Sequence, residues 1–220
     1  MGLLEVLRMR GNPRRRYNEL AGLYRRRGDA VEHPEVPILL DRLAVEPGET
    51  VLDVGCGLGY ALEVLAERVG PGGHAIGVDV SDRMIEFATE RIDGAGFGDR
   101  TTLHRLDARD LAPIGDGSVD AATLTFTLEV LPPEHRPAVL AECRRVLDAE
   151  GRLGVLAIAS EDSLAVSLYE RANRIVPGLV DSRPIDAAAV LTANGFSVET
   201  VERHRVGRLP VDLVVARSTD

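Results

Sequence analysis

From about residue 50 onward, short runs of apolar and β-branched residues alternate with longer segments in which apolar residues recur at helical spacing. The predicted strands are residues 50–54, 74–80, 101–106, 119–125, 152–159, 197–202 and 211–216. The predicted helices are residues 58–69, a segment that starts at about Ser81, and residues 134–147, 163–175 and 185–194. This alternation predicts an α/β fold: a doubly wound, mostly parallel seven-stranded sheet with helices on both faces.

The last two predicted strands, residues 197–202 and 211–216, are separated by a short turn. This spacing predicts an antiparallel C-terminal hairpin at one edge of the sheet. A dinucleotide-binding fold would instead continue with parallel βαβ units. The hydroxyl of Ser81 is suited to capping the second helix, and Gly195 is placed to end the helix before the hairpin.

The first 35 residues differ from the rest of the chain. Residues 14–16 and 25–27 are all Arg and are interleaved with Leu20, Leu23 and Tyr24, which gives the segment some amphipathic helical character. Residues 1–30 carry a net charge of +5, which leaves −14 on the remainder. We therefore predict a helical lid or appendage over residues 1–35 and one domain over residues 36–220. Solvated arginines are the simpler interpretation of the same pattern.

A glycine-rich string, VLDVGCGLG, begins with the first predicted strand and continues into the turn after it. Gly55, Gly57 and Gly59 would leave a backbone turn without side chains, which lets a ligand approach the start of the next helix. A dinucleotide fingerprint requires its third glycine one position later, where this chain has Tyr60. The pattern G-x-G-x-G therefore favours a different adenosine-type cofactor.

The whole string resembles motif I of the class I S-adenosylmethionine-dependent methyltransferases. The resemblance covers roughly residues 17–217 and is most similar to ubiquinone and menaquinone biosynthesis methyltransferases and to bacterial phosphatidylethanolamine N-methyltransferases. The similarity to these lipid-modifying enzymes rests on three segments: YNELAGLY near the start, and SRPIDAAAVLTANGF and RLPVDLVVAR near the end. It implies an enzyme that uses S-adenosylmethionine, releases S-adenosylhomocysteine, and methylates a small, lipophilic acceptor, either quinone-like or a phospholipid headgroup.

Two carboxylates extend the match. Asp79 ends the second predicted strand, twenty residues after Gly59, where a carboxylate can accept hydrogen bonds from both ribose hydroxyls. Asp107 follows the third strand, where the family places a carboxylate or neighbouring backbone near the adenine amino group. A helix cap is the other interpretation of Asp107, although Asp110 could also serve as that cap.

The segment TFTLEVL resembles the part of the family that follows strand four and closes over the cofactor. The strand-five signature departs from the family pattern, because Asp148, Ala149 and Glu150 stand where Lys-Pro-Gly is usual. The residues that the resemblance implies for cofactor binding are Gly55, Cys56, Gly57, Gly59, Asp79, Val80, Met84, Asp107, Ala108 and Thr125.

Methyl transfer from a sulfonium is an in-line displacement, so alignment and exclusion of water are the main tasks of the protein. A dedicated base is optional, and we assign no catalytic residue from the sequence. Glu129, His33, Tyr17 and Tyr24 are the candidates if the acceptor must lose a proton. The simpler interpretations are helix surface for Glu129 and N-terminal packing for the tyrosines.

Composition excludes several other chemistries. All 26 basic residues are Arg, so the chain lacks the Lys that a Walker-type phosphate loop, a pyridoxal enzyme or a common short-chain dehydrogenase requires. The histidines show no metal-ligand spacing, so we expect no metal site. With only Cys56 and Cys143 there is no disulfide framework, and Cys143 is expected in the core of the helix over residues 134–147.

The net charge of −9 argues against nucleic acid as a partner. No secretory signal or membrane-spanning run is evident, so we expect a cytoplasmic protein whose partner is a small-molecule acceptor. The Arg-rich N-terminus is the one feature suited to a peripheral contact with an anionic membrane. No feature specifies an oligomeric state.

Two alternatives to methyl transfer remain at the level of the sequence. A nicotinamide-dependent oxidoreductase would share the ribose carboxylate, but Tyr60 and the missing Lys count against it. A module that binds S-adenosylmethionine without transferring its methyl group is suggested only by the altered turn at residues 148–150.

Overall fold

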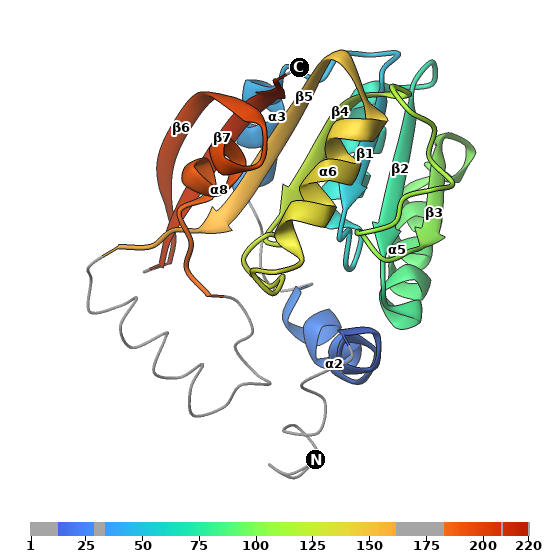
Figure 1. The fold of residues 1–220 in the computed structure, drawn as a ribbon. Coiled ribbons are helices and arrows are strands. Elements are labelled where there is room, and N and C mark those ends of the chain that lie inside the picture. Colours follow the sequence, from blue (N-terminus) through green and yellow to red (C-terminus); the bar gives the residue numbers. More distant parts are fainter. Residues whose placement is uncertain (1–12, 29–33, 162–182, 208, 220) are drawn as a thin grey trace, which may run out of the picture.

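A computed structural model of the chain describes residues 13–28, 34–161, 183–207 and 209–219 (Figure 1). The helix predicted over residues 163–175 lies outside the described residues. The described helices are α2 (Pro13–Gly28), α3 (Glu35–Leu43), α4 (Tyr60–Val69), α5 (Asp82–Ala95), the short 3-10 helix η1 (Gly98–Arg100), α6 (Arg136–Val146) and α8 (Ala187–Ala193). The side chains of α2 are described for residues 14–22.

Seven strands form one sheet in the order β3-β2-β1-β4-β5-β7-β6. Their bounds are β1 (Thr50–Val54), β2 (His74–Asp79), β3 (Thr101–Arg105), β4 (Val119–Thr125), β5 (Leu147–Ile158), β6 (Phe196–Val206) and β7 (Leu209–Ser218). Strands β1 to β5 pair in parallel, whereas β7 runs antiparallel to both β5 and β6. The predicted sheet, mostly parallel with an antiparallel C-terminal hairpin, is confirmed.

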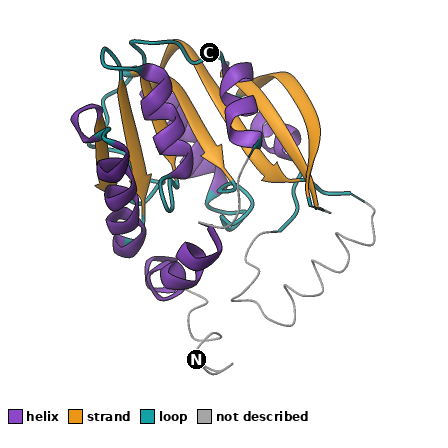
Figure 2. Cartoon of the chain, turned by 180° about the vertical axis from the view of Figure 1, so that it is seen from behind, coloured by secondary structure: helices purple, strands orange, loops and turns teal. Residues whose placement is uncertain are grey.

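Helices cover both faces of the sheet, as Figures 1 and 2 show from opposite sides. Alternation along β1 explains why both faces are apolar: Leu52 and Val54 belong to the core cluster under α6 and α8, and Val51 belongs to the cluster under α3 and α4. Both clusters consist of fully or almost fully buried side chains. Cys143 is completely buried in the first cluster, as predicted.

The structure differs from the predicted elements mainly at α3 and at the start of β5, and β6 and β7 are longer than predicted. Helix α3 was not predicted, and its buried face, which includes Leu39 and Leu43, packs against β5 and β7. Strand β5 begins at Leu147, five residues earlier than predicted, because Leu147 pairs with Val119 before a register shift in the β4 to β5 ladder. The predicted cap at Ser81 is confirmed, since its hydroxyl accepts a hydrogen bond from the backbone nitrogen of Met84.

Helix α2 packs on α5 and lies near the carboxyl ends of the parallel strands (Figure 1). Ala21 of α2 forms a small buried cluster with Met84 and Phe87 of α5, and Tyr17 packs against this cluster. This position is compatible with a lid, and the division into a lid over residues 1–35 and a domain over residues 36–220 stays a prediction. Within the described ranges, every helix is too short or too polar to cross a bilayer.

Candidate cofactor and acceptor pocket

A pocket of about 710 Å³ lies where β1, β2, β3 and β4 end. Strand order reverses between β1 and β4, the place where open α/β sheets bind their ligands. The volume is within the range of small-molecule sites. The lining includes nine of the ten residues predicted to bind the cofactor, namely Gly55, Cys56, Gly57, Asp79, Val80, Met84, Asp107, Ala108 and Thr125.

The tenth predicted residue, Gly59, is not part of the pocket lining, and the structure gives it another role. Gly59 precedes α4 with a φ of 81°, and a β-carbon there would lie 3.0 Å from both the α- and β-carbons of Ala88 on α5. Gly55 is also required by packing, because a β-carbon at that position would come within 2.6 Å of the Thr127 side chain. These two glycines hold the turn against its neighbours.

Gly57 differs from these two glycines, because no atom of the described residues would clash with a β-carbon at this position. Its φ is 52°, and a β-carbon built there would have only the carbonyl oxygen of Gly55 nearby, at 4.0 Å. The space beside Gly57 therefore belongs to the pocket. A backbone that is bare on this side allows a ligand to contact it directly.

Asp79 connects the turn after β1 to the turn after β2. One carboxylate oxygen accepts a hydrogen bond from the backbone nitrogen of Gly57 at 3.1 Å, and the other accepts one from the backbone nitrogen of Ser81 at 2.8 Å. Burial raises the pKa of Asp79, and these backbone hydrogen bonds oppose that rise. Because each carboxylate oxygen has a second lone pair, both can still accept a hydroxyl donor from the pocket.

A second buried carboxyl, Asp53 of β1, lies beneath the glycine turn. It accepts a hydrogen bond from the hydroxyl of Thr123 at 2.8 Å, and its other oxygen has no partner among the described residues. Burial raises the pKa of Asp53 to about 7, and the charge of Asp79 adds to the effect of burial. The sequence analysis did not single out this residue.

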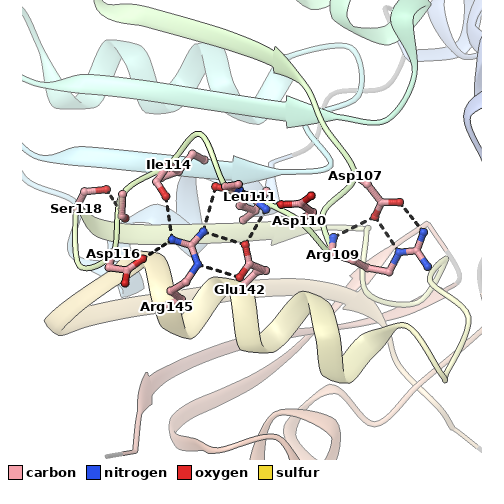
Figure 3. Close-up of polar contacts among 11 residues, drawn as sticks. Asp107, Arg109, Asp110, Leu111, Ile114, Asp116, Ser118, Glu142 and Arg145 are labelled. Carbon is pink, nitrogen blue, oxygen red and sulfur yellow. Dashed lines mark hydrogen bonds and ion pairs between the residues drawn. The ribbon is translucent and has the colours of Figure 1, made fainter.

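Asp107 is held by Arg109 in a two-pronged ion pair, which Figure 3 shows. The guanidinium donates to the two carboxylate oxygens at 3.0 and 2.6 Å, and the backbone nitrogen of Arg109 donates to the same carboxylate at 3.0 Å. These contacts lower the pKa of Asp107. Arg109 also lies 3.2 Å from Nε2 of His135, and a guanidinium has only donors, so that nitrogen is the acceptor.

The loop between β3 and β4 is fastened to α6 by Arg145 and Glu142 (Figure 3). Arg145 donates to the carbonyl oxygens of Ile114 and Leu111 at 2.9 and 3.0 Å and forms an ion pair with Asp116 at 2.6 Å. Glu142 accepts a hydrogen bond from the backbone nitrogen of Leu111 at 2.7 Å. The loop that carries Asp107 is therefore held against α6 over residues 111–116.

Apolar and aromatic groups also line the pocket. They come from elements far apart in the sequence: Tyr17 of α2, Val36 of α3, Tyr60 of α4, and Phe126 and Leu131 after β4. Phe126 has a φ of 53°, an uncommon conformation for a residue other than glycine and one that occurs at binding and catalytic sites. Of these residues, the sequence analysis proposed only Tyr17 as a site residue.

Three cationic side chains at the pocket are already paired. Arg14 contacts Asp82 at 2.8 Å, Arg105 contacts the same carboxylate at 3.3 Å, and Arg109 is held by Asp107. The neighbouring carboxylate offsets the positive charge of each guanidinium and so weakens its attraction for an anionic ligand.

Of the candidate bases, Tyr17 and Glu129 can be located in the structure, and they lie in different surroundings. Tyr17 lines the pocket, whereas Glu129 is not part of the lining and is 1% exposed in a turn after β4, not on a helix surface. Glu129 accepts a hydrogen bond from the backbone nitrogen of Ile158, and burial raises its pKa to about 7. Its buried location gives no support to the interpretation as a base. His33 and the side chain of Tyr24 lie outside the described part of the chain.

Known proteins share both the sequence and the fold of this region. Residues 51–151 match a family model described as a methyltransferase domain. The nocamycin O-methyltransferase of Saccharothrix syringae is 37% identical over 140 residues, which is 63% of this chain and 48% of that protein. The demethylmenaquinone methyltransferase of Lactobacillus johnsonii is 36% identical over 115 residues, which is 52% of this chain and 46% of that protein. The chain thus spans about half the length of these curated relatives.

A solved methyltransferase from Aquifex aeolicus, described as S-adenosylmethionine-dependent, superposes with a TM-score of 0.64 over 98% of both chains at 20% identity. At this identity the superposition demonstrates a common fold. Residues 51–151 thus match a methyltransferase domain in sequence, and the chain has the fold of an S-adenosylmethionine-dependent methyltransferase. S-adenosylmethionine is the cofactor of this class.

Proposed function

We propose that this chain transfers the methyl group of S-adenosylmethionine to a small, lipophilic, quinone-like acceptor. The observation that carries the proposal is that two unlike sets of groups line one pocket, and we call these sets its cofactor side and its acceptor side. The cofactor side consists of the bare Gly57 backbone and the Asp79 carboxylate, and the acceptor side consists of apolar and aromatic side chains. A methyl donor and its acceptor must be bound together in this way for a direct transfer.

The residues present fit the cofactor. The two carboxylate oxygens of Asp79 are available to the ribose hydroxyls, and the open space at Gly57 suits the methionine portion. Asp107 and Ala108 are proposed to contact the adenine. Because Arg109 already supplies three hydrogen bonds to Asp107, one lone pair of that carboxylate is left for the adenine amino group.

S-adenosylmethionine, when bound, supplies a methyl group that is already activated on a sulfonium. The chain's contribution is to align the acceptor atom with that methyl group and to keep water away. In the pocket, the apolar side chains of Val36, Phe126 and Leu131 are suited to excluding water. Of the two candidate proton acceptors whose side chains the structure describes, Tyr17 lines the pocket and Glu129 does not.

A quinone-like acceptor is favoured over a phospholipid headgroup by the charges of the pocket. A headgroup phosphate would need a cation, and the lining arginines Arg14, Arg105 and Arg109 are each paired with a carboxylate. The name of the demethylmenaquinone relative supports the same choice.

Calorimetry with S-adenosylhomocysteine tests the cofactor part of the proposal. We expect binding by the wild-type protein and a loss of about 100-fold or more in Asp79→Ala, because two charge-assisted hydrogen bonds to the ribose contribute on the order of 1.5–3 kcal/mol each. Asp99→Ala is a matched control, since Asp99 is exposed and forms its ion pair with the neighbouring residue Arg100. Its affinity should stay within about twofold of wild type.

The absence of binding at about 1 mM ligand would contradict the proposal. Thermal stabilisation by a nicotinamide dinucleotide, without stabilisation by S-adenosylmethionine, would favour an oxidoreductase instead. Transfer of a labelled methyl group into a cell extract separates an enzyme from a module that only binds the cofactor. The labelled product then identifies the acceptor.

A further inference from the structure

Helix α2 supplies a side chain that caps the start of α5, a helix on a different part of the chain. The amide oxygen of Asn18 accepts a hydrogen bond from the backbone nitrogen of Arg83 at 3.2 Å and another from the hydroxyl of Ser81 at 2.6 Å. The amide nitrogen of Asn18 donates to Asp82 at 3.2 Å. Asn18 thus completes the N-terminal cap that Ser81 begins, because a helix leaves its first backbone donors without partners.

Arg14, one helical turn before Asn18, reinforces the same contact. Its guanidinium donates to both oxygens of Asp82 at 2.8 and 3.0 Å. The contacts from Arg14 and Asn18 lower the pKa of Asp82 to about 2. Arg14 and Asn18, which are one turn apart on α2, are therefore both directed at the first turn of α5.

The cap is continuous with the proposed cofactor site. Ser81, whose hydroxyl contacts Asn18, donates its backbone nitrogen to the carboxylate of Asp79. Ser81 is fully buried, so it has little room to take another position while α2 is docked. Two further residues of α2, Arg14 and Tyr17, line the pocket itself.

We propose that Asn18 is a positioning residue that couples the docking of α2 to the occupation of the cofactor site. The inference rests on the proposed function, because it takes Asp79 as the ribose ligand. When α2 is docked, Asn18 fixes Ser81 and, through it, the orientation of the Asp79 carboxylate. The cofactor therefore binds the docked form more tightly, and by thermodynamic reciprocity the cofactor stabilises docking by the same factor.

Limited trypsin digestion of the full chain measures docking directly, because α2 carries cleavage sites at Arg14, Arg15 and Arg16. Cleavage within a docked helix requires local opening, so its rate reports the open population. We expect saturating S-adenosylhomocysteine to slow the cleavage after these three residues by about tenfold, a typical coupling. Mass spectrometry of the new N-termini distinguishes these cuts from cuts elsewhere.

Asn18→Ala tests the residue. We expect the affinity for S-adenosylhomocysteine to fall by about tenfold and the ligand-dependent protection to fall below about twofold. Glu19→Gln is the matched control on the same helix, since Glu19 forms its ion pair with Arg15 and not with α5. It should retain both the affinity and the protection. Circular dichroism and thermal melting establish that each variant is folded.

The outcomes separate the two proposals. If the wild-type protein binds S-adenosylhomocysteine but its α2 is cut at the same rate with and without ligand, the coupling is wrong and the cofactor site stands. The coupling is also wrong if Asn18→Ala keeps wild-type affinity and protection. If the wild-type protein does not bind the ligand at all, the proposed function fails, and this inference fails with it.

Discussion

The two sides of the pocket are built from different kinds of groups. The cofactor side consists of backbone and carboxylates that follow three neighbouring strands, and its main parts are Gly57, Asp79 and Asp107. The acceptor side consists of side chains from α2, α3 and α4 and from the loop after β4. Short local segments therefore define where the cofactor would bind, whereas the acceptor side exists only once distant elements have packed together.

Each side also rests on a buried carboxyl group that does not line the pocket. Asp53 lies beneath the glycine turn, and Glu129 is a buried residue of the loop after β4. Each has one carboxylate oxygen without a hydrogen-bond partner among the described residues. Two carboxyl groups that are costly to bury therefore lie next to the pocket, and binding sites often contain such destabilising groups.

The largest expected effect is a difference in stability between variants of Gly57 and Gly59, two glycines of the same turn. Gly59→Ala places a β-carbon against Ala88 at a positive φ, so we expect it to lower the free energy of unfolding by about 2–4 kcal/mol. Gly57→Asn tolerates its backbone conformation and points its side chain into open space, so it should cost about 1 kcal/mol or less. Denaturant titration measures both changes.

For ligand binding we expect the opposite order: Gly57→Asn should lose more affinity than Gly59→Ala. Gly57→Asn fills the proposed methionine space, so we expect its affinity for S-adenosylhomocysteine to fall at least tenfold, or about 1.4 kcal/mol. Gly59→Ala, at a temperature where it is folded, should bind within about threefold of wild type. A ligand affinity for Gly57→Asn equal to that of wild type would remove Gly57 from the cofactor site.

An intermediate effect concerns the two buried carboxyls. Their pKa values of about 7 exceed the ordinary values near 4, so between pH 4 and pH 7 the folded state binds more protons than the unfolded state. Each group therefore contributes stability that is present below pH 4 and is lost as the pH rises through 7. Asp53→Asn and Glu129→Gln remove this titration.

We expect the free energy of unfolding of each variant, relative to that of the wild-type protein, to rise by on the order of a few kcal/mol between pH 4 and pH 8. The measurement is the difference in unfolding free energy between wild type and variant at several pH values, which cancels the groups that both proteins share. A difference that stays constant with pH would show that the carboxyl titrates normally.

The smallest expected effect probes the acceptor side. Tyr17→Leu keeps an apolar side chain for Ala21 and Met84 but removes the phenol from the pocket. We expect the KM for the acceptor found by methyl labelling to rise about threefold to tenfold, with the affinity for S-adenosylhomocysteine within about twofold of wild type. An equal loss for both ligands would mean that the two sides of the pocket are not separate.

The parts of the molecule that follow from local chemistry could be predicted from the sequence. Strands β1 and β4 have the predicted bounds, and the cap at Ser81 and the position of Asp79 beside the glycine turn are as expected. Each of these depends on a few consecutive residues whose backbone preferences and polarity determine the local structure. Helix α3 was missed because its nine residues include a Pro and carry no strong start signal.

The acceptor side and the cap from Asn18 could not be predicted, for a different physical reason. Asn18 and Arg83 are 65 residues apart, and Arg109 and His135 are 26 apart, so only the packed fold brings them together. The role of Gly59 was assigned from a motif, whereas its conformation and its approach to Ala88 are explained by helix packing. A motif thus identifies a turn correctly without stating which of its residues face the ligand.

The place of β7 between β5 and β6 has a consequence for the order in which the chain can be completed during synthesis. Strand β5 pairs with β7 over residues 152–158, so one edge of β5 has no partner until residues 211–217 have left the ribosome. Strand β6 is made earlier, and in the sheet that the structure describes its ladder partner is β7. A nascent chain that pauses before residue 209 therefore presents an open, apolar sheet edge, the kind of surface that chaperones must shield from other chains.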